Sequence, residues 1–381
     1  MSKYKIMTPG PVQVPENVRL ARSLSTTNAD LDPQFYDEYK ETCELISELL
    51  HTKNETLILS GEGILGLEAA CASMTEPGDR VLILDNGIYG AGFADFVSMY
   101  GGTPVMYTKD YKNAFDVDEL DAYLNEDHDF KYATVVHCDT PSGMLNDIHK
   151  ICPLLKSYGI MTVTDSVSGM FGNEVNVDKA QIDILCGGSQ KAVSAPPGLT
   201  FVTISDEAKK AMENRKTPIA SFYCNLTIFK DYYKNLWFPY TMPISDIMGL
   251  DVALDNILEE GLENVHNRHA KVANATRKAV KEYGLNLFLE NGYSNTVTAI
   301  CIDEEIGAGN LVKHLLEKYN LVMTTSLNQY TGKILRIGHM GENAKYEAIV
   351  PVLNYIDLGL KDLGFKTDKN LVELFNKYYN A

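Results

Sequence analysis

Short apolar runs alternate with stretches of helical spacing between residues 56 and 204. Several of these runs have no polar alternation, which is typical of strands covered on both faces of a sheet. Buried strands that alternate with helices favour parallel strands joined by helical crossovers. The pattern therefore predicts an α/β fold with a mostly parallel, seven-stranded sheet. The predicted strands cover residues 56–60, 81–85, 104–107, 133–138, 161–165, 182–186 and 200–204.

The chain on either side of this predicted sheet divides into an arm and a second domain. The turn-forming segment Thr8-Pro9-Gly10-Pro11 cannot be helical and predicts an irregular arm. Helical spacing over residues 33–50 predicts one helix, and helical spacing over 245–283 predicts a long helical region that leads into a smaller α+β domain. The expected division is an arm (1–25), a large domain (26–260) and a small C-terminal domain (261–381). The small domain is expected to contain strands 296–302, 321–325 and 334–337 and helices 309–319, 343–362 and 368–380.

The region between residues 205 and 244 is rich in aromatic side chains and less regular. Left exposed, these side chains would form a sizeable apolar patch, which is typical of an interaction surface. They are predicted to cover a pocket or to form a subunit interface. They are Phe222, Tyr223, Phe229, Tyr232, Tyr233, Trp237, Phe238 and Tyr240.

Composition narrows the class of protein. The 381 residues carry a net charge of −17, which argues against a nucleic-acid groove or an anionic membrane as partner. The seven cysteines are scattered without a C-x-x-C pair, so neither a disulfide framework nor a zinc site is expected. No histidine pair has metal-ligand spacing, and no metal is expected. The first residues lack an apolar leader and no run approaches a membrane span of about 20 residues, so a cytoplasmic protein is expected.

Lys191 is the first candidate for chemistry. It closes the segment Cys186-Gly187-Gly188-Ser189-Gln190-Lys191, directly after an apolar run predicted to be a buried strand. Lysine is seldom buried, because its ammonium group loses hydration there. A pocket lysine with a lowered pKa becomes a nucleophile that can form a Schiff base. The alternative is a lysine that opens the next loop and extends to solvent.

Asp165 supports the first interpretation of Lys191. It ends the predicted strand 161–165, and the carboxyl ends of parallel strands are where α/β proteins bind ligands. Only 26 residues, one strand and one crossover, separate Asp165 from Lys191. A carboxylate and an amine at neighbouring strand ends match the needs of pyridoxal phosphate, whose ring nitrogen is kept protonated by an acid while a lysine holds its aldehyde. Alone, Asp165 could equally cap the turn that follows it.

A glycine-containing turn is a candidate anion site. Ser60-Gly61-Glu62-Gly63-Ile64 lies between a predicted strand and a predicted helix, so free backbone N–H groups and the helix dipole would face one point. Glycine is also common in ordinary strand-to-helix turns, and this turn is neither a dinucleotide fingerprint nor a P-loop.

Several motifs, in order along nearly the whole chain, resemble those of class V aminotransferases, which are fold type I pyridoxal-phosphate enzymes. The resemblance is greatest to the alanine–glyoxylate and serine–pyruvate aminotransferases. The motifs are Thr8-Pro9-Gly10-Pro11, Ser60-Gly61-Glu62-Gly63, Asn86-Gly87-Ile88-Tyr89-Gly90, His137-Cys138-Asp139-Thr140-Pro141-Ser142-Gly143, Asp165-Ser166-Val167-Ser168, Gly188-Ser189-Gln190-Lys191, Ala195-Pro196-Pro197-Gly198 and Leu335-Arg336-Ile337-Gly338.

This resemblance implies a role for individual residues. Lys191 would be the Schiff-base lysine and would move the proton between the amino acid's α-carbon and the cofactor, while Asp165 would pair with the ring nitrogen. The other implied cofactor contacts are Tyr89 stacked on the ring, Thr140 on the phenolic oxygen, Gln190 with the backbone of Glu62, Gly63 and Ile64 at the phosphate, and Thr241 reaching the phosphate from the neighbouring subunit.

The resemblance also implies a substrate site in a homodimer whose active site is shared between subunits. Arg336 would bind the α-carboxylate of a small amino acid or oxo acid, and Gly10 would lie near the substrate. Asn28 lies about where a loop of the neighbouring subunit approaches the substrate in the family. Two residues depart from the family pattern. Glu62 stands where serine is frequent, so its carboxylate must point away or be paired near a phosphate. Phe238 replaces a frequent tyrosine, whose hydroxyl Tyr240 could supply.

Three alternatives remain at this stage. A 2-aminoethylphosphonate–pyruvate transaminase shares the tyrosine-containing turn but tends to have asparagine where this chain has Gln190. A cysteine desulfurase requires a downstream thiol, and Cys301 follows Lys191 by 110 residues, although it lies in a predicted strand. A scaffold that binds no cofactor is the third. The expected function is transamination of alanine or serine with glyoxylate or pyruvate by a ping-pong mechanism.

Overall fold

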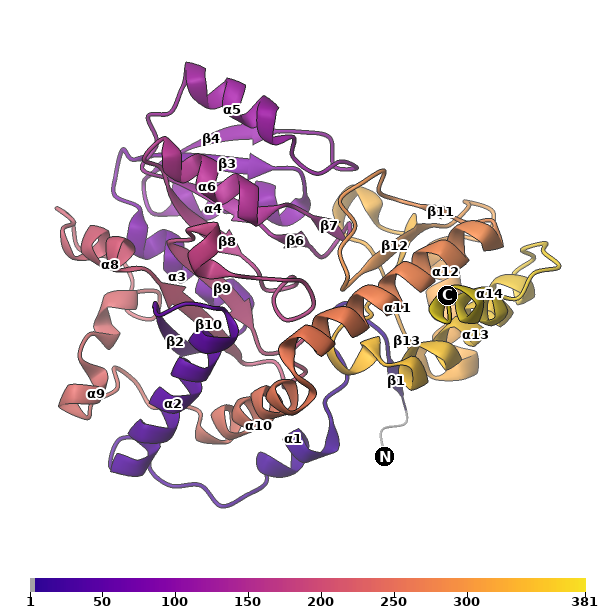
Figure 1. The fold of residues 1–381 in the computed structure, drawn as a ribbon, viewed down its shortest axis with the longest axis horizontal. Helices are drawn as coiled ribbons and strands as arrows, with labels where there is room; N and C mark the ends of the chain where they lie inside the picture. The colour runs from indigo at the N-terminus through magenta and orange to yellow at the C-terminus, as the bar shows by residue number, and fades with distance from the viewer. Residues whose placement is uncertain (1–3) are drawn as a thin grey trace.

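The computed structural model describes residues 4–381, and residues 1–3 of the predicted arm lie outside it. A seven-stranded sheet forms the centre of the larger domain (Figure 1). The strand order is β2-β10-β9-β8-β5-β3-β4, and only β10 is antiparallel to its neighbours, which confirms the predicted α/β sheet. The strands are β2 Glu55–Ser60, β3 Arg80–Asp85, β4 Thr103–Thr108, β5 Tyr132–Val136, β8 Met161–Asp165, β9 Ile184–Gly188 and β10 Leu199–Ile204.

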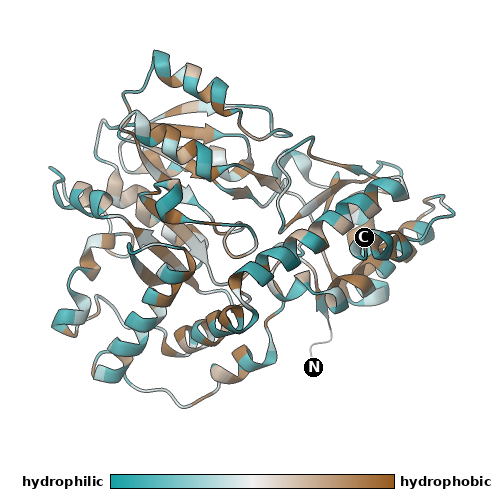
Figure 2. Cartoon of the chain, viewed as in Figure 1, coloured by the Kyte–Doolittle hydropathy of each residue, from teal (hydrophilic) through white to brown (hydrophobic). Residues whose placement is uncertain are grey.

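Helices enclose this sheet. Every residue of β5, β9 and β10 is buried, as the continuous apolar runs require. Hydrophobic residues gather in the central strands, and polar residues occupy the outer surfaces of the helices (Figure 2). No helix within residues 4–381 is long and apolar enough to cross a membrane. The helices are α1 Glu16–Ala21, α2 Pro33–Leu49, α3 Gly63–Met74, α4 Ile88–Met99, α5 Val117–Glu126, α6 Ile148–Ser157, α7 Val177–Ala180, α8 Asp206–Glu213, α9 Tyr232–Asn235 and α10 Ile244–Glu260.

The smaller C-terminal domain has its own core. Its antiparallel four-stranded sheet has the order β11-β12-β15-β14 and packs with helices α11 to α14 (Figure 1). The elements are α11 Leu262–Tyr283, β11 Asn286–Leu287, β12 Thr298–Cys301, α12 Ala308–Tyr319, β13 Leu321–Val322, β14 Thr324–Thr325, β15 Ile334–Ile337, α13 Tyr346–Asp362 and α14 Leu371–Tyr379.

The long helical region predicted over 245–283 is confirmed, and it divides into two helices. Gly261 adopts φ +84°, a conformation that a helix cannot continue through and that glycine tolerates best, and it separates α10 from α11. The start of α11 belongs to the core of the large domain through Val265, whereas from Val272 onward it packs into the C-terminal core. This helix therefore connects the two cores.

The N-terminal arm is more ordered than predicted. Strand β1 (Lys5–Ile6) pairs in parallel with β13, and α1 forms where no regular element was expected. A two-residue strand and a six-residue helix are too short to produce a clear periodic pattern. Met7 lies in the C-terminal core and Val12 in the core of the large domain, so the arm joins both.

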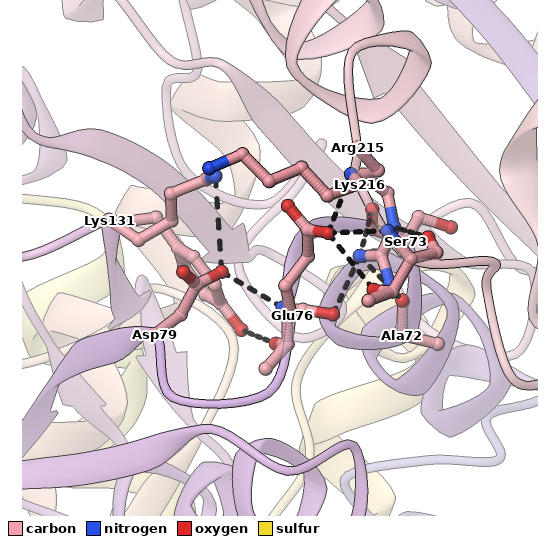
Figure 3. A network of polar contacts seen from close by, with 10 residues as sticks. Ala72, Ser73, Glu76, Asp79, Lys131, Arg215 and Lys216 are labelled. Carbon is pink, nitrogen blue, oxygen red and sulfur yellow. Dashed lines mark hydrogen bonds and ion pairs between the residues drawn. The ribbon is translucent and has the colours of Figure 1, made fainter.

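The C-terminal end of α3 is fixed by a network of polar contacts (Figure 3). Nη1 of Arg215 donates to the backbone carbonyls of Ala72, Ser73 and Thr75 at 3.4, 3.0 and 2.6 Å. The carboxylate of Glu76 accepts two backbone N–H groups that follow Arg215, both at 2.8 Å. A guanidinium group at this end satisfies orphan helix carbonyls and complements the helix dipole. The opposite end of α3 faces the cavity described next.

Candidate active site

A cavity of about 300 Å³ opens at the carboxyl ends of β8 and β9, beside the first turn of α3. Nine of the twelve predicted site residues line it, and Thr241, Asn28 and Arg336 do not. A cavity at this edge of the sheet is expected for a ligand site in an α/β protein. The lining residues are Gly10, Pro11, Glu62, Gly63, Ile64, Leu67, Tyr89, Thr140, Asp165, Val167, Ser168, Gln190, Lys191 and Pro197.

Lys191 lies inside this cavity and does not extend to solvent. Its side chain is only 9% exposed, and Nζ donates to the backbone carbonyl of Pro9 at 2.6 Å. Burial lowers the pKa of Lys191 to about 8, which outweighs the attraction of nearby anionic groups. Gly10 permits this approach, because a Cβ atom there would lie 2.5 Å from Nζ. The amine is therefore partly uncharged, and so nucleophilic, slightly above neutral pH.

Asp165 lies at the end of β8, the strand adjacent to β9. One carboxylate oxygen accepts the N–H of Val167 at 2.9 Å. Burial raises the pKa of Asp165 to about 7, although Lys191 and the hydrogen bond from Val167 act in the opposite direction. A cationic partner, such as a protonated ring nitrogen, stabilises the charged form of a buried carboxylate of this kind.

The raised pKa of Asp165 predicts a pH-dependent effect on stability. In the unfolded chain the pKa returns to about 4, so the folded state disfavours the charged form. This cost is absent below about pH 4, grows as pH rises and is complete above about pH 7. Asp165→Asn is therefore expected to raise the melting temperature of the ligand-free protein at pH 8 by at least about 3 °C, and by less at pH 5, in scanning calorimetry.

Asp183→Asn is the matched control for this experiment. Asp183 is also buried, but it is paired with Lys156 at 2.7 Å. Loss of that pair is expected to lower the melting temperature at pH 8. An equal loss of stability in both variants would contradict the account of Asp165.

Tyr89 and Thr140 are held by residues whose importance the sequence reasoning missed. The N–H of Tyr89 donates to Oδ1 of Asp139 at 3.0 Å, and this carboxylate is buried. The hydroxyl of Thr140 forms a short hydrogen bond with that of Ser168, which also lines the cavity. Val167 was missed as a lining residue too. Asp139, Val167 and Ser168 belong to the quoted motifs, so their nearness to Thr140 and Asp165 was the available signal. Pro11, Leu67 and Pro197 also line the cavity and were not predicted.

Arg336 is buried behind Thr140 without an acidic partner. Its guanidinium group donates to the carbonyl of Thr325 at 3.0 and 2.7 Å and to that of Thr140 at 3.2 Å. Burial lowers the pKa of Arg336. Among residues 4–381, no carboxylate lies within ion-pair distance of it. A buried, unpaired guanidinium group is suited to an anionic ligand such as a carboxylate.

Thr241 and Asn28 are exposed and lie outside the cavity of the single chain. Phe238 is a core residue, stacked on Tyr36 with ring centroids 4.5 Å apart. The hydroxyl of Tyr240 is buried without a hydrogen-bond partner among the described residues, and Tyr240 does not line the cavity.

The residues at the inner end of the cavity fit a pyridine ring with an aldehyde, because an amine, a carboxylate and a hydroxyl face one space.

The end at α3 differs. Glu62 was expected to point away or to be paired, and it is paired. Its Oε1 accepts the N–H of Ile64 at 3.1 Å, and its Oε2 accepts from Nε2 of Gln190 at 3.2 Å. The carboxylate therefore occupies the helix N-terminus that a phosphate group would use, and this end does not fit a dianion.

Cys301 does not belong to this site. It lies in β12, as the sequence predicted, and it does not line the cavity. Burial raises the pKa of its thiol, which disfavours the nucleophilic thiolate. The structure gives no support to a cysteine desulfurase.

Comparisons with known proteins agree with this geometry. The family profile "Aminotransferase class-V" matches residues 19–328. The chain is 34% identical to a pyridoxamine–pyruvate transaminase of Mesorhizobium japonicum over 89% of this chain and 87% of the relative. It is 31% identical to a serine–glyoxylate aminotransferase of Arabidopsis thaliana over 95% of this chain and 92% of the relative.

A solved structure gives the same result for the fold. A ureidoglycine–glyoxylate aminotransferase of Bacillus subtilis superposes with a TM-score of 0.95 at 28% identity, over 100% of this chain and 99% of the other. The predicted fold type I architecture and the predicted aminotransferase activity are confirmed. The chain belongs to the class V aminotransferases, a family of pyridoxal-phosphate-dependent enzymes.

Proposed function

We propose that this aminotransferase moves the amino group of a small amino acid, such as alanine or serine, to a small oxo acid, such as glyoxylate or pyruvate. The observation that carries the proposal is the meeting of a buried amine and a buried carboxylate at adjacent strand ends, with an unpaired arginine behind Thr140. A cavity of about 300 Å³ lies at the small end of ligand sites, which supports small substrates. Both half-reactions use the same site in turn.

Each residue has a separate task in the proposed reaction. The cofactor, when bound, acts as the electron sink for the substrate's α-carbon. Lys191 would take the proton from the substrate's α-carbon on Nζ and would deliver it to the carbon of the cofactor that carries the aldehyde. Asp165 would keep a proton on the ring nitrogen, and Arg336 would orient the α-carboxylate by a two-pronged contact that requires its planar group.

The remaining predicted residues bind and orient. Tyr89 would cover the ring, Thr140 would donate to the phenolic oxygen, and Gln190 would act with the first turn of α3 (Glu62, Gly63 and Ile64) at the outer end. Gly10 keeps the space beside Nζ open for the substrate, since any side chain there would collide with Lys191.

We propose a homodimer whose active sites are completed across the interface. Large apolar side chains are exposed near α1, near the start of α2 and in the aromatic segment, and segments 222–241 and 20–36 pack together through Phe238 and Tyr36. Such a patch on one chain is typical of a subunit interface. Thr241 and Asn28 lie in these segments, so each would reach the partner's site. The exposed side chains are Leu20, Leu24, Leu31, Phe222, Tyr223 and Trp237, between 53% and 79% exposed.

The double variant Leu31→Glu/Trp237→Glu is expected to dissociate the dimer and to lower activity at least about 10-fold, because two charges would be buried at the interface. Sedimentation velocity and an activity assay at the same protein concentration measure both effects. Leu358→Glu, at a 40% exposed position on α13, is the control and should remain dimeric. A double variant that stays dimeric and fully active would contradict the proposed interface.

We further propose that residues 26–260 and 261–381 are separate domains joined at Gly261, with residues 1–25 as an arm between them. All seven cysteines carry free thiols, which supports a reducing cytoplasm as the compartment.

The substrate pair is tested by product analysis. Purified enzyme is incubated with single amino acids and single oxo acids, with pyridoxal phosphate or pyridoxal supplied in separate reactions, and the new amino acid is identified by mass spectrometry. Alanine or serine with glyoxylate or pyruvate is expected to give the fastest transfer. The alternative substrate, 2-aminoethylphosphonate, is not favoured, since it lacks the α-carboxylate that Arg336 would bind in this proposal. Faster transfer from that compound than from every α-amino acid would overturn the assignment.

A further inference from the structure

We propose that Glu62 makes the α3 end of the cavity selective for a hydroxyl group, so that the site takes pyridoxal and pyridoxamine in their phosphate-free form. The proposal rests on the function proposed above and names the form of the ring compound that the same site accepts.

Glu62 occupies the N-terminus of α3. Glu62 is the N-cap of α3, and its carboxylate receives the N–H of Ile64. Backbone N–H groups of a first helical turn are the usual donors to a phosphate group. Here the chain's own carboxylate has taken one of them. A phosphate that uses the N–H of Ile64 and the amide of Gln190 must displace Glu62 from both.

The side chains at the α3 end of the cavity offer hydrogen-bond acceptors. Gln190 is 6% exposed, and its Oε1 is buried without a partner among residues 4–381, while its Nε2 is occupied by Glu62. The side chains at this end therefore offer acceptors: an amide oxygen and a carboxylate. A phosphate dianion also carries only acceptors, so it cannot pair with them. The hydroxymethyl group of pyridoxal carries a donor and can satisfy either oxygen.

The charges that line the cavity also disfavour a phosphate group. Among the lining residues, Glu62 and Asp165 are acidic and only Lys191 is basic. The donors of Arg336 point to the carbonyls of Thr140 and Thr325 on the other side of the cavity. A dianion would add two negative charges beside Glu62 with no further cation lining the space, and like charges at close range are costly. A neutral hydroxymethyl group adds none.

Loss of the phosphate anchor has a consequence for turnover. Pyridoxal or pyridoxamine that is bound without a phosphate group exchanges with the solution, and it therefore acts as a substrate. The amino group and two electrons then pass from pyridoxamine to the oxo acid: the C–N bond of pyridoxamine breaks, a C–N bond forms at the oxo acid, and the carbonyl oxygen is exchanged through water to give pyridoxal and an amino acid. No other oxidant or reductant is required.

The test compares the affinity of the full-length protein for pyridoxal and for pyridoxal phosphate, each titrated separately and followed by ring absorbance. Borohydride reduction and peptide mass spectrometry then give the mass of any adduct on Lys191. Wild-type protein is expected to bind pyridoxal at least about 10-fold more tightly than the phosphate ester, and Glu62→Ser is expected to strengthen binding of the ester about 100-fold. Glu62→Gln removes the charge while keeping the size, and should give a smaller gain.

Asp116→Ser is the matched control, because Asp116 is an acidic N-cap of α5 that does not line the cavity. It should leave both affinities unchanged. Tight binding of pyridoxal phosphate to Lys191 with Glu62 in place would overturn this inference and leave the transaminase proposal intact. Absence of any adduct with either compound would overturn both. Retained binding of pyridoxal by Glu62→Ser shows that the variant is folded.

Discussion

Lys191→Ala is expected to lower the rate of transamination by at least about 10⁴-fold, because one side chain supplies both the nucleophile and the proton-transfer group. Among residues 4–381, Lys191 is the one lysine that lines the cavity, and its amine is buried with a lowered pKa. Single-turnover kinetics with the amino acid substrate measures the loss.

Two controls separate chemistry from folding in that experiment. Lys191→Arg keeps a positive charge but cannot form an imine, so it should be as inactive as Lys191→Ala. A small added amine such as methylamine should restore part of the proton transfer in Lys191→Ala, since the removed side chain leaves space. Activity in Lys191→Arg within about 10-fold of wild type would contradict the assigned role.

Arg336→Lys is expected to reduce kcat/KM for α-amino acids by about 100- to 1000-fold, or about 3–4 kcal/mol, because a lysine cannot make the two parallel contacts of a guanidinium group. Most of the loss should appear in KM, since the α-carboxylate is bound throughout the reaction. Steady-state kinetics with alanine measures the effect.

A substrate without a carboxylate is the internal control for Arg336. Transfer from a simple primary amine should be equally slow in wild type and in Arg336→Lys. If the variant lost the same factor with both substrates, Arg336 would be a structural residue rather than the carboxylate-binding one.

The central sheet, Lys191 and Asp165 could be predicted from the sequence, because each depends on the pattern of apolar residues along a short stretch of chain. Unbroken apolar runs required strands buried on both faces, and Lys191 and Asp165 each follow such a run. The carboxyl ends of adjacent parallel strands meet at one edge, so their joint presence in the cavity followed from topology. The short helix α1 and the break at Gly261 could not be predicted in this way, because neither produces a periodic pattern in the sequence.

Side-chain direction was the part that sequence could not supply. Glu62 could have pointed to solvent, and only its contacts with Ile64 and Gln190 reveal that it occupies the helix terminus. The approach of Pro9 to Lys191 likewise joins residues 182 positions apart, which no local spacing predicts. Thr241 and Asn28 were predicted to act from a neighbouring subunit, and their exposure in one chain leaves that role a prediction.

The most direct test of the whole account is to identify the residue that binds a vitamin B6 aldehyde covalently. The protein is incubated with pyridoxal or pyridoxal phosphate, reduced with borohydride, digested and sequenced by mass spectrometry. One labelled residue, Lys191, is expected, with labelling suppressed by an amino acid substrate. Labelling spread over surface lysines, or none at all, would contradict this expectation.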